Sequence, residues 1–514
     1  MARWDEAAVQ CGLPEMLLME NAAREALHVL EECAGPLRGK RILLYMGAGK
    51  NGGDAACLAR HLKDQGAQPL VLHTRPLGFY KGATARHLRL ARTCGVPFLP
   101  VLAPQSRRPA EWRQPDIVID GLLGTGFAGQ VKEHMRPLVD AINTLGEHGF
   151  VFALDLPSGL DAVSGLPRPV AVRAKATVCF EAAKPGLVLP EAAPYTGRLY
   201  VRRIGIPADA AAAHSPSYRL LDASCARLLP RAEPGTHKGS FGHVFVLGGS
   251  EGLTGAAHLA ALAALRMGCG LVSVAAPGGL CAEIRAAVPE MMFFPLGRGT
   301  SWQDAISSGA LDELASLAAR ADALVVGPGM GRSPEAGELL AALLRLPRRP
   351  PLVLDADALM LSATGMVPLA GLNAGDILTP HPGEAGGLLG ISARRVQEDR
   401  FAAMRDLCAL HPALWILKGS GSLIGQKGHP VLISPHHVPC LAVGGSGDVL
   451  SGCVGSLLAQ GCAASLAAAF GVLAHIHAGQ MLGQSFPGRG NTASEIAHML
   501  PKAKAVLSEQ ASYA

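Results

Sequence analysis

The chain repeats one local pattern, in which a short apolar run leads into a glycine-rich turn and then into a helical segment. Residues 40–49, KRILLYMGAG, have the composition of a buried strand followed by such a turn, and residues 54–66 have helical spacing. The pattern continues through 69–73, 82–95, 116–126 and 150–159. Strands that alternate with helices form parallel sheets with helices on both faces. The first half of the chain therefore predicts an α/β fold.

The length of the chain predicts more than one domain, because a single hydrophobic core seldom organises 514 residues. Between 205 and 235 the pattern gives way to a stretch rich in Ala, Pro and Ser. Residues 242–270 then start it again with GHVFVLGGSEGLTGAAHLAALAALRMGCG. We expect two α/β domains, residues 1–215 and residues 216–514, without a convincing internal repeat.

Charge and cysteine content narrow the class of partners. A net charge of +5 over this length does not indicate nucleic acid. Twelve cysteines without a CxxC pair indicate small buried residues in a reducing compartment, and the N-terminal segment lacks a cleavable apolar region. We expect a cytoplasmic homo-oligomer that acts on small molecules, with no nucleic-acid or membrane partner.

One uncharged segment, residues 449–474, is long enough to span a membrane. It is dominated by Gly, Ala, Ser and Cys and contains Gln460, and Gly461 lies near its middle. This composition predicts two close-packed buried helices rather than a membrane span.

Three strand ends in the first half carry polar residues. The segment GAGKNGGDAA, residues 47–56, presents small residues before a helix, which suits an anion, although it lacks both GxGxxG and GxxxxGK[ST] spacing. Asn51, Asp120 and Ser158 offer hard oxygens suited to an alkali or alkaline-earth cation. Each of them alone also fits a turn or a helix cap. Ligands bind beyond the carboxyl ends of parallel strands, so we expect a shared site there.

These segments resemble the epimerase domain of NAD(P)H-hydrate repair enzymes, in the motifs LLMENAAREAL, GAGKNGGD, DGLLGTG, DLPSGLD and CFEAAKPGL. The resemblance implies a Rossmann-like three-layer α/β/α domain that interconverts the R and S forms of hydrated NADH and NADPH. It implies that Asp155 contacts the hydrate as the acid–base catalyst, with Asp120 as second choice, and that Asn51, Asp120 and Ser158 bind K⁺. It also implies that the hydrate site is lined by Lys50, Asn51, Gly52, Gly53, Asp54, Gly124, Thr125, Gly126, Phe127, Ala128, Gly129 and Gln130. Lys50 and Ala55 depart from the usual Asn and Gly of the family.

The second half contains four further segments whose residues suit binding or catalysis. LTPHPGE holds His381 between two prolines, and ILKGSGS, residues 416–422, is a strand leading to Lys418 and a small-residue loop suited to phosphate. AVGGSGDVLSG places Asp448 between a glycine-rich loop and an uncharged helix. Asp448 could be a helix cap, part of a phosphate loop or a catalytic carboxylate. The acids of LDADAL fit either a metal site or turn and capping roles.

With HKG, GGSEGLTGAA, GPGMG and DADAL, these segments resemble the NAD(P)H-hydrate dehydratase domain, which is ribokinase-like. The resemblance implies that ADP phosphorylates the C6 hydroxyl of the hydrate, with Mg²⁺ accompanying the nucleotide, and that loss of phosphate restores the double bond. It implies Asp448 as the base, hydrate contacts from Ala256, Gly329, His381 and Asp448, and nucleotide contacts from Lys418, Gly419, Ser420, Gly421, Ser422 and Gly447. Val443 and Ser446 replace usual threonines.

Two alternatives accompany this interpretation. One is a ribokinase-like small-molecule kinase of the hydroxymethylpyrimidine type, with a non-catalytic N-terminal binding module. The other keeps the dehydratase but makes the first domain a binding module, because Lys50 departs from the family pattern.

Overall fold

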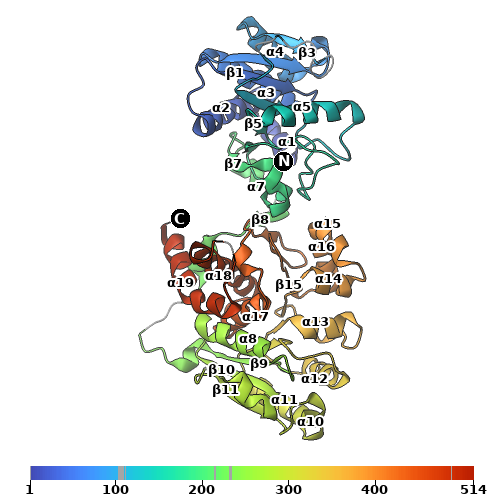
Figure 1. Cartoon of the computed structure of the whole chain (residues 1–514), viewed down its shortest axis with the longest axis vertical. Coiled ribbons are helices and arrows are strands. Elements are labelled where there is room, and N and C mark those ends of the chain that lie inside the picture. Colours follow the sequence, from blue (N-terminus) through green and yellow to red (C-terminus); the bar gives the residue numbers. More distant parts are fainter. Residues whose placement is uncertain are drawn as a thin grey trace. The chain divides into compact units, whose positions relative to one another are not determined.

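The chain folds into two compact units, Met1–Pro216 and Ser217–Ala514, each of which is described by itself (Figure 1). The structure, a computed structural model, describes residues 2–101, 109, 112–212, 216–230, 234–286, 288–487 and 489–513. Each unit is built on one sheet with helices on both of its faces. The expected architecture of two α/β domains is confirmed.

The first unit has an all-parallel sheet in the order β3-β2-β1-β4-β5-β6-β7. The strands are β1 (Arg41–Met46), β2 (Gln68–His73), β3 (Phe98–Pro100), β4 (Ile117–Gly121), β5 (Phe150–Leu154), β6 (Ala176–Phe180) and β7 (Arg198–Arg202). The main helices are α1 (Ala2–Gln10), α2 (Glu15–Ala34), α3 (Lys50–Asp64), α4 (Gly82–Thr93) and α5 (Arg136–Gly146).

Side chains along β1 point alternately to the two faces of the sheet, and each face has its own hydrophobic core. Ile42, Leu44 and Met46 face the layer formed by α2, α3 and α4, whereas Leu43 and Tyr45 face the layer that contains α5. Helix α3 begins at Lys50, four residues earlier than the helix predicted from Asp54. Residues 50–54 therefore form a helical first turn rather than an extended loop.

The second unit has a mixed sheet in the order β11-β10-β9-β12-β13-β14-β15-β16-β17-β8. The strands are β8 (Tyr218–Leu220), β9 (His243–Leu247), β10 (Leu271–Pro277), β11 (Met292–Leu296), β12 (Ala323–Val326), β13 (Leu352–Leu354), β14 (Ile377–Leu378), β15 (Leu414–Leu417), β16 (Leu423–Gly425) and β17 (Val431–Ile433). Among the described strands of this sheet, the β15–β16 and β16–β17 pairs are antiparallel and the others are parallel. The parallel part, from β11 to β15, presents its carboxyl ends at one edge.

One face of the second sheet is covered by four helices that contribute to one hydrophobic core, α8 (Thr254–Met267), α17 (Ser446–Ala459), α18 (Ala464–Ser485) and α19 (Ala493–Tyr513). Along the other side lie α11 (Ala310–Arg320), α12 (Pro334–Leu344), α13 (Ala356–Ala363), α14 (Pro382–Leu389), α15 (Ala393–Glu398) and α16 (Arg400–Leu410) (Figure 1).

The uncharged segment is two buried helices, as predicted. Gly461, at φ +82°, lies in the turn that separates α17 from α18. Among the described residues, α18 alone has the length and composition of a membrane span, and 72% of its most apolar window is buried in the fold. It is a core helix of this unit. All twelve cysteines are free.

Candidate active sites

A cavity of about 1150 Å³ lies beyond the carboxyl ends of β1, β4 and β5 in the first unit. Most of the residues predicted to contact the hydrate line it, namely Lys50, Asn51, Asp54, Gly124, Thr125, Gly126, Phe127, Ala128, Gln130 and Asp155. Gly52, Gly53 and Gly129 do not line it. A Cβ atom at Gly52 would overlap the carbonyl of Gly47, and one at Gly53 would press on Met19 and Thr84. These two glycines allow α3 to pack closely.

A buried lysine holds Asp155 at the wall of this cavity. Lys184, 4% exposed, donates a short hydrogen bond to Asp155 Oδ1, and the Thr125 amide donates to Oδ2 over 3.4 Å. Burial acts to lower the pKa of the Lys184 ammonium, but the charge of Asp155 outweighs burial and the pKa lies above its usual value. Asp155 has φ +64°, a conformation that L residues seldom adopt outside functional sites.

Asp54 provides a second carboxyl group in the lining of this cavity. Burial raises its pKa well above the usual value, and the charges of Asp155 and Asp5 add to the shift. Asp54 therefore keeps its proton to a higher pH than an exposed aspartate does. The cavity wall thus combines a carboxyl group with a raised pKa and a second carboxyl group that is paired with Lys184.

The three residues predicted to bind a cation form one hydrogen-bond network, in which Asn51 and Ser158 contact the backbone of Leu123 and Asp120 contacts Ser158. Asn51 Nδ2 donates to Leu123 O over 2.7 Å, and the Leu123 amide donates to Ser158 Oγ over 2.8 Å. Ser158 donates from Oγ and from its amide to Asp120, at 2.6 and 2.7 Å. Asn51 Oδ1 is buried without a hydrogen-bond partner among the described residues. A buried amide oxygen without a donor, beside a buried carboxylate, fits a cation.

Lys50 faces acids at the mouth of the same cavity. Its Nζ lies 2.8 Å from Glu15 Oε1 and 3.7 Å from Asp5 Oδ2. Lys50 therefore neither crowds the buried cation ligands nor carries an unneutralised charge. Ala55, the other departure, is buried and lies against Gly121.

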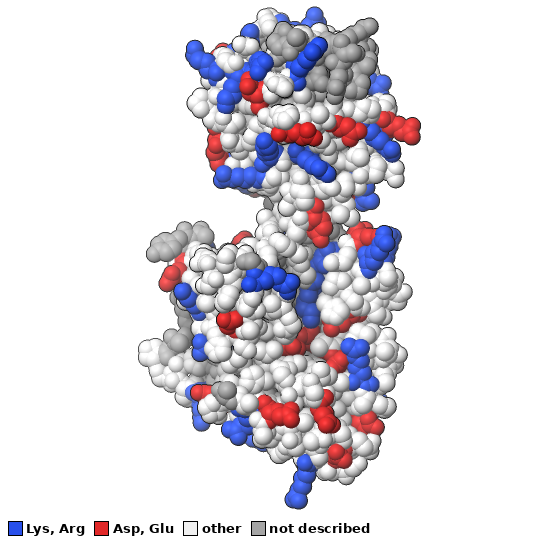
Figure 2. Space-filling view, viewed as in Figure 1, with Lys and Arg blue, Asp and Glu red and all other residues white. Residues whose placement is uncertain are grey.

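Four ionisable side chains meet at the carboxyl edge of the second sheet: Asp355 after β13, Glu384 in the first turn of α14, Lys418 after β15 and Asp448 in the first turn of α17. Lys418 Nζ lies 2.5 Å from Asp355 Oδ1 and 3.7 Å from Glu384 Oε2. Figure 2 shows a hollow on this face of the second unit with basic and acidic side chains inside it. Asp355 Oδ2 is buried without a hydrogen-bond partner in the described part of the chain.

Burial sets the protonation of this cluster. It raises the pKa of Asp448 to about 7, helped by the charge of Asp355 and opposed by Lys418. It raises the pKa of Glu384 to about 7 as well, opposed by Lys418 and helped by Asp355. One ammonium among several carboxyl groups leaves Asp448 able to accept a proton near neutral pH.

Asp448 is not the cap of its helix. Gly445, at φ +86°, occupies the N-cap position of α17 and makes no side-chain capping bond. A Cβ atom at Gly447 would lie 3.3 Å from Lys418 Nζ, so the glycine keeps the space above the ammonium free. The first turn of α17, Asp448 and Lys418 therefore share one site, and the amides of that turn suit an anion.

The 418–422 loop is held from below by Arg400. This buried side chain donates to the carbonyls of Leu417, Lys418 and Gly421, at 3.2 to 3.4 Å. Ser420 Oγ lies 2.7 Å from His437 Nδ1. The loop is thus a rigid, small-residue platform beside Lys418.

The remaining predicted hydrate contacts fall in two places. Gly329, at φ +61°, lies against Ala256, and Ser250 donates to its carbonyl over 2.9 Å. His381 caps α14, where its Nδ1 accepts from the amides of Gly383 and Glu384. Burial and the charge of Lys418 lower the pKa of His381, so its half-exposed ring is neutral.

Comparison with known proteins gives both units a family. Residues 15–186 match the family described as YjeF-related protein N-terminus, and residues 244–502 match the family described as NAD(P)H-hydrate dehydratase. A bifunctional NAD(P)H-hydrate repair enzyme of Moorella thermoacetica is 38% identical over 95% of this chain and 92% of its own. The chain belongs to the family of bifunctional NAD(P)H-hydrate repair enzymes.

Other repair enzymes of the family show the same full-length similarity. The Escherichia coli relative is 31% identical over 96% of this chain and 90% of its own. A crystal structure of an ADP/ATP-dependent NAD(P)H-hydrate dehydratase from Bacillus subtilis, co-crystallised with ATP and Mg²⁺, is 25% identical and covers 56% of this chain and 98% of that chain, with a TM-score of 0.47. The resemblance seen in the sequence is confirmed. Membership of this family takes the place of the alternative of a small-molecule kinase of the hydroxymethylpyrimidine type.

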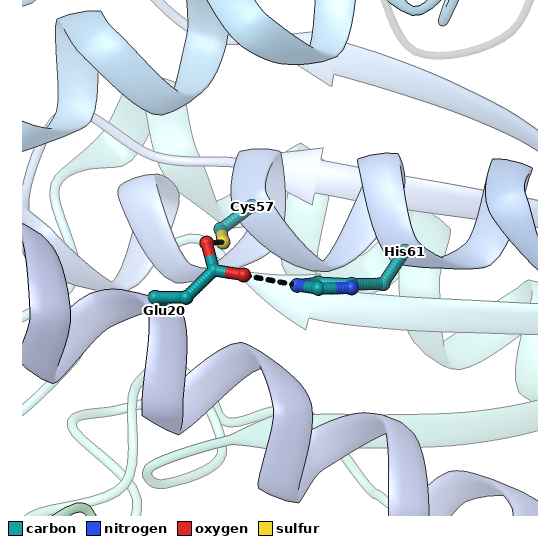
Figure 3. A group of neighbouring side chains, drawn as sticks. All are labelled: Glu20, Cys57 and His61. Carbon is teal, nitrogen blue, oxygen red and sulfur yellow. Dashed lines mark hydrogen bonds and ion pairs between the residues drawn. The ribbon is translucent and has the colours of Figure 1, made fainter.

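The first unit also contains a group that has the ligand types of a metal site. Glu20 on α2 lies with Cys57 and His61 of α3 (Figure 3), the one such group among the described residues. Arg60 already fills the position of a cation, because its Nη2 lies 2.7 and 2.6 Å from the two carboxylate oxygens of Glu20. Burial opposes ionisation of Glu20, but the Arg60 hydrogen bond prevails and lowers its pKa to about 2. This group is a structural ion pair of the repair enzyme.

Several site residues escaped the sequence analysis. Lys184 lies within the motif CFEAAKPGL, but the motif alone does not indicate that this lysine pairs with Asp155. Arg400 is buried, and arginine is seldom buried in proteins, so its place beneath the 418–422 loop was not expected. Arg489 and Asn491 donate, at 2.8 Å each, to the carbonyls of Ala442 and Cys440, and so clamp the segment before Asp448. The sequence GRGNT carries no local signal for that contact.

Proposed function

We propose that the first unit interconverts the R and S hydrates of NADH and NADPH, and that the second unit dehydrates the S hydrate to NAD(P)H with ADP converted to AMP and phosphate. The observation that carries the proposal is the placement of Asp448 beside Lys418 at the start of α17. That arrangement combines a base with an anion site, as transfer of a phosphoryl group requires.

In the first unit, the C6–O bond of the hydrate must break and form again on the other face. The raised pKa of Asp54 suits it to donate a proton to the departing hydroxyl, which leaves as water. The positive charge left at C6 is shared with the adjacent ring nitrogen. Asp155, which accepts a hydrogen bond from Lys184, is placed to take a proton from the water that adds. Proton donor and acceptor end with exchanged roles, as a reversible epimerisation requires.

K⁺ is the cation that we assign to Asn51, Asp120 and Ser158. The free Oδ1 of Asn51 and the carboxylate of Asp120 would serve as ligands, and Ser158 would add its hydroxyl oxygen. Bound K⁺ would supply positive charge beneath the 122–126 loop. The chain's own contribution is to hold Leu123, and with it the cavity wall formed by Gly124 and Thr125, in place.

In the second unit, Asp448 is placed to take the proton of the C6 hydroxyl as that oxygen attacks the β-phosphorus of ADP. AMP departs, and the hydroxyl oxygen becomes a phosphate ester. Phosphate, a better leaving group than hydroxide, then departs with loss of a proton from C5, which restores the C5–C6 double bond. Lys418 and the first-turn amides of α17 bind the phosphates, and the 418–422 loop supports the nucleotide.

Mg²⁺ accompanies the nucleotide in this proposal. Asp355, with its free Oδ2, and Glu384 have the carboxylate oxygens that would hold it, directly or through water. The metal would neutralise charge on the transferred phosphoryl group. The cytoplasmic location and the homo-oligomeric state remain predictions from the sequence.

The experiment supplies an R/S mixture of hydrated NADPH with ADP and Mg²⁺ and follows the absorbance of the reduced nicotinamide. Complete recovery, with release of AMP and phosphate, is expected. No recovery would refute the repair function. Recovery that stops at the S fraction would refute the epimerase and leave the first unit as a binding module.

A further inference from the structure

We propose that Arg75 and Lys132 bind the phosphates of the dinucleotide in the cavity of the first unit, and so fix the direction in which the hydrate enters. The inference rests on the epimerase function proposed above. It concerns the part of the cavity that is lined by Arg75, after β2, and Lys132, between β4 and α5.

Four basic side chains of Lys or Arg line this cavity, and they fall into two kinds. Lys184 is buried and pairs with Asp155, and Lys50 pairs with Glu15 and Asp5. Arg75 and Lys132 are exposed and form no ion pair with an acid of the described residues. The guanidinium of Arg75 lies 5.4 Å from the centre of the Phe79 ring, a contact that fixes its position without neutralising its charge.

The acids that line the cavity lie on other segments. Asp5 and Glu6 belong to α1, Glu15 begins α2, Asp54 is on α3 and Asp155 follows β5. Arg75 follows β2, and Lys132 lies between β4 and α5. The wall thus presents acids, some of them paired with Lys50 or Lys184, on one set of segments and unpaired cations on another. An anionic group bound against the acids would be repelled, whereas one against Arg75 and Lys132 would be attracted.

Size supports a ligand with both a reacting ring and phosphates. A volume of about 1150 Å³ exceeds what a nicotinamide ring alone would fill. The reacting C6 atom belongs beside Asp54 and Asp155, so the phosphates of the same ligand would lie against Arg75 and Lys132. Lys50 is less suited to bind a phosphate, because Glu15 and Asp5 already neutralise its charge.

The test compares epimerisation by the full chain and its R75Q, K132M and double variants, using hydrated NADH and hydrated NADPH at low and high salt. Each single variant is expected to raise KM about tenfold, as loss of a charge-assisted contact does, with kcat changed less than about twofold. The salt dependence of KM should weaken in the double variant. An equal effect on both substrates assigns the cations to the pyrophosphate, and an effect on hydrated NADPH alone assigns them to its extra phosphate.

K63M is the matched control, because Lys63 is exposed on α3 and does not line the cavity. Dehydration of the S hydrate by the second unit reports that each variant is folded and should not change. A KM within about twofold of wild type for both substrates, at low salt, overturns the proposal. If the wild type does not epimerise, the proposed function fails. Calorimetric titration with NADP⁺ then tests the role of Arg75 and Lys132 separately. Loss of a binding event in the double variant supports their role in phosphate binding, and unchanged binding overturns it.

Discussion

Lys418 Nζ lies between two carboxylates, 2.5 Å from Asp355 Oδ1 and 3.7 Å from Glu384 Oε2, at the edge of the second sheet where α17 begins. A single ammonium therefore neutralises part of an acidic cluster and remains directed at the space above Gly447. This relationship joins the ends of β13 and β15 with the first turns of α14 and α17, and the chemistry of the second unit depends on it.

Replacing Lys418 by Met is expected to reduce kcat/KM for dehydration at least about 100-fold, because phosphates would meet uncompensated carboxylates. Titration with ADP should show weakened binding. Epimerisation by the same chain provides the control and should be unchanged. Normal ADP affinity in the variant would contradict the assignment of Lys418.

Asp448→Asn should leave ADP binding largely intact and lower the dehydration rate at least about 100-fold, since an amide cannot take the hydroxyl proton. Single-turnover measurement of AMP release separates binding from chemistry. Turnover at the wild-type rate would remove Asp448 from the mechanism.

The pH dependence of dehydration should follow the raised pKa of Asp448, about 7. The base is active when ionised, so kcat is expected to rise with pH through about 7. The same shift acts on stability with the opposite sign: the folded state holds a proton that the unfolded state releases at about pH 4, so stability falls as pH rises from about 4 to about 7. Glu384 has a pKa of about 7 too, so Glu384→Gln is the comparison. If the rise of kcat with pH disappears in Glu384→Gln, the group responsible for that rise is Glu384 instead of Asp448.

Lys184→Met should lower the epimerisation rate at least about 100-fold, because Asp155 loses the buried ion-pair partner that holds its carboxyl group at the cavity wall. The measurement is the rate at which pure R hydrate becomes available to the dehydratase. Dehydration of pure S hydrate is the control. A variant that epimerises normally would show that Asp155 needs no partner.

Replacing K⁺ by a quaternary ammonium ion is expected to abolish epimerisation and to spare dehydration of the S hydrate, if Asn51, Asp120 and Ser158 bind K⁺. Because bound K⁺ stabilises only the folded form, the thermal midpoint of the first unit should also rise with K⁺ concentration. An epimerase that is indifferent to K⁺ in both measurements would exclude this site.

Asn491→Asp tests the clamp on the segment before Asp448. The aspartate has the same shape but cannot donate to the carbonyl of Cys440. We expect kcat for dehydration to fall about tenfold, with a smaller change in KM for ADP and no change in epimerisation. A variant that matches wild type in kcat would mean that Arg489 and helix packing hold the segment alone.

The parts of both sites that follow strands directly could be predicted from the sequence. Asp155 and Lys418 each follow a strand and stand beside a small-residue turn, and such turns mark the carboxyl edge of a parallel sheet. Asp448 could be predicted from the glycine-rich loop that precedes its helix. The roles of the LDADAL acids stayed open. The structure shows that Asp355 occupies an N-cap position without a capping bond and pairs with Lys418 instead.

Partners from distant segments could not be predicted in the same way. Lys184 reaches Asp155 across 29 positions, and Asn491 reaches Cys440 across 51. Nothing local distinguishes them from surface lysine and asparagine, because burial and pairing arise only when the sheet assembles. Packing could not be predicted for the glycines at 52 and 53 either: a Cβ atom at Gly52 would overlap the carbonyl of Gly47, and one at Gly53 would press on Met19 and Thr84. Their contact with the hydrate stays a prediction.

The Glu20, Cys57 and His61 group has a consequence for the first unit in cells that meet thiophilic metals. Its cation is the guanidinium of Arg60, which is tethered to the same helix as Cys57 and His61 and is present at a high effective concentration. An incoming ion would have to displace a counter-ion that cannot diffuse away. The unit is thereby insulated from fluctuations in metal supply at a place where its ligand types would otherwise invite occupation.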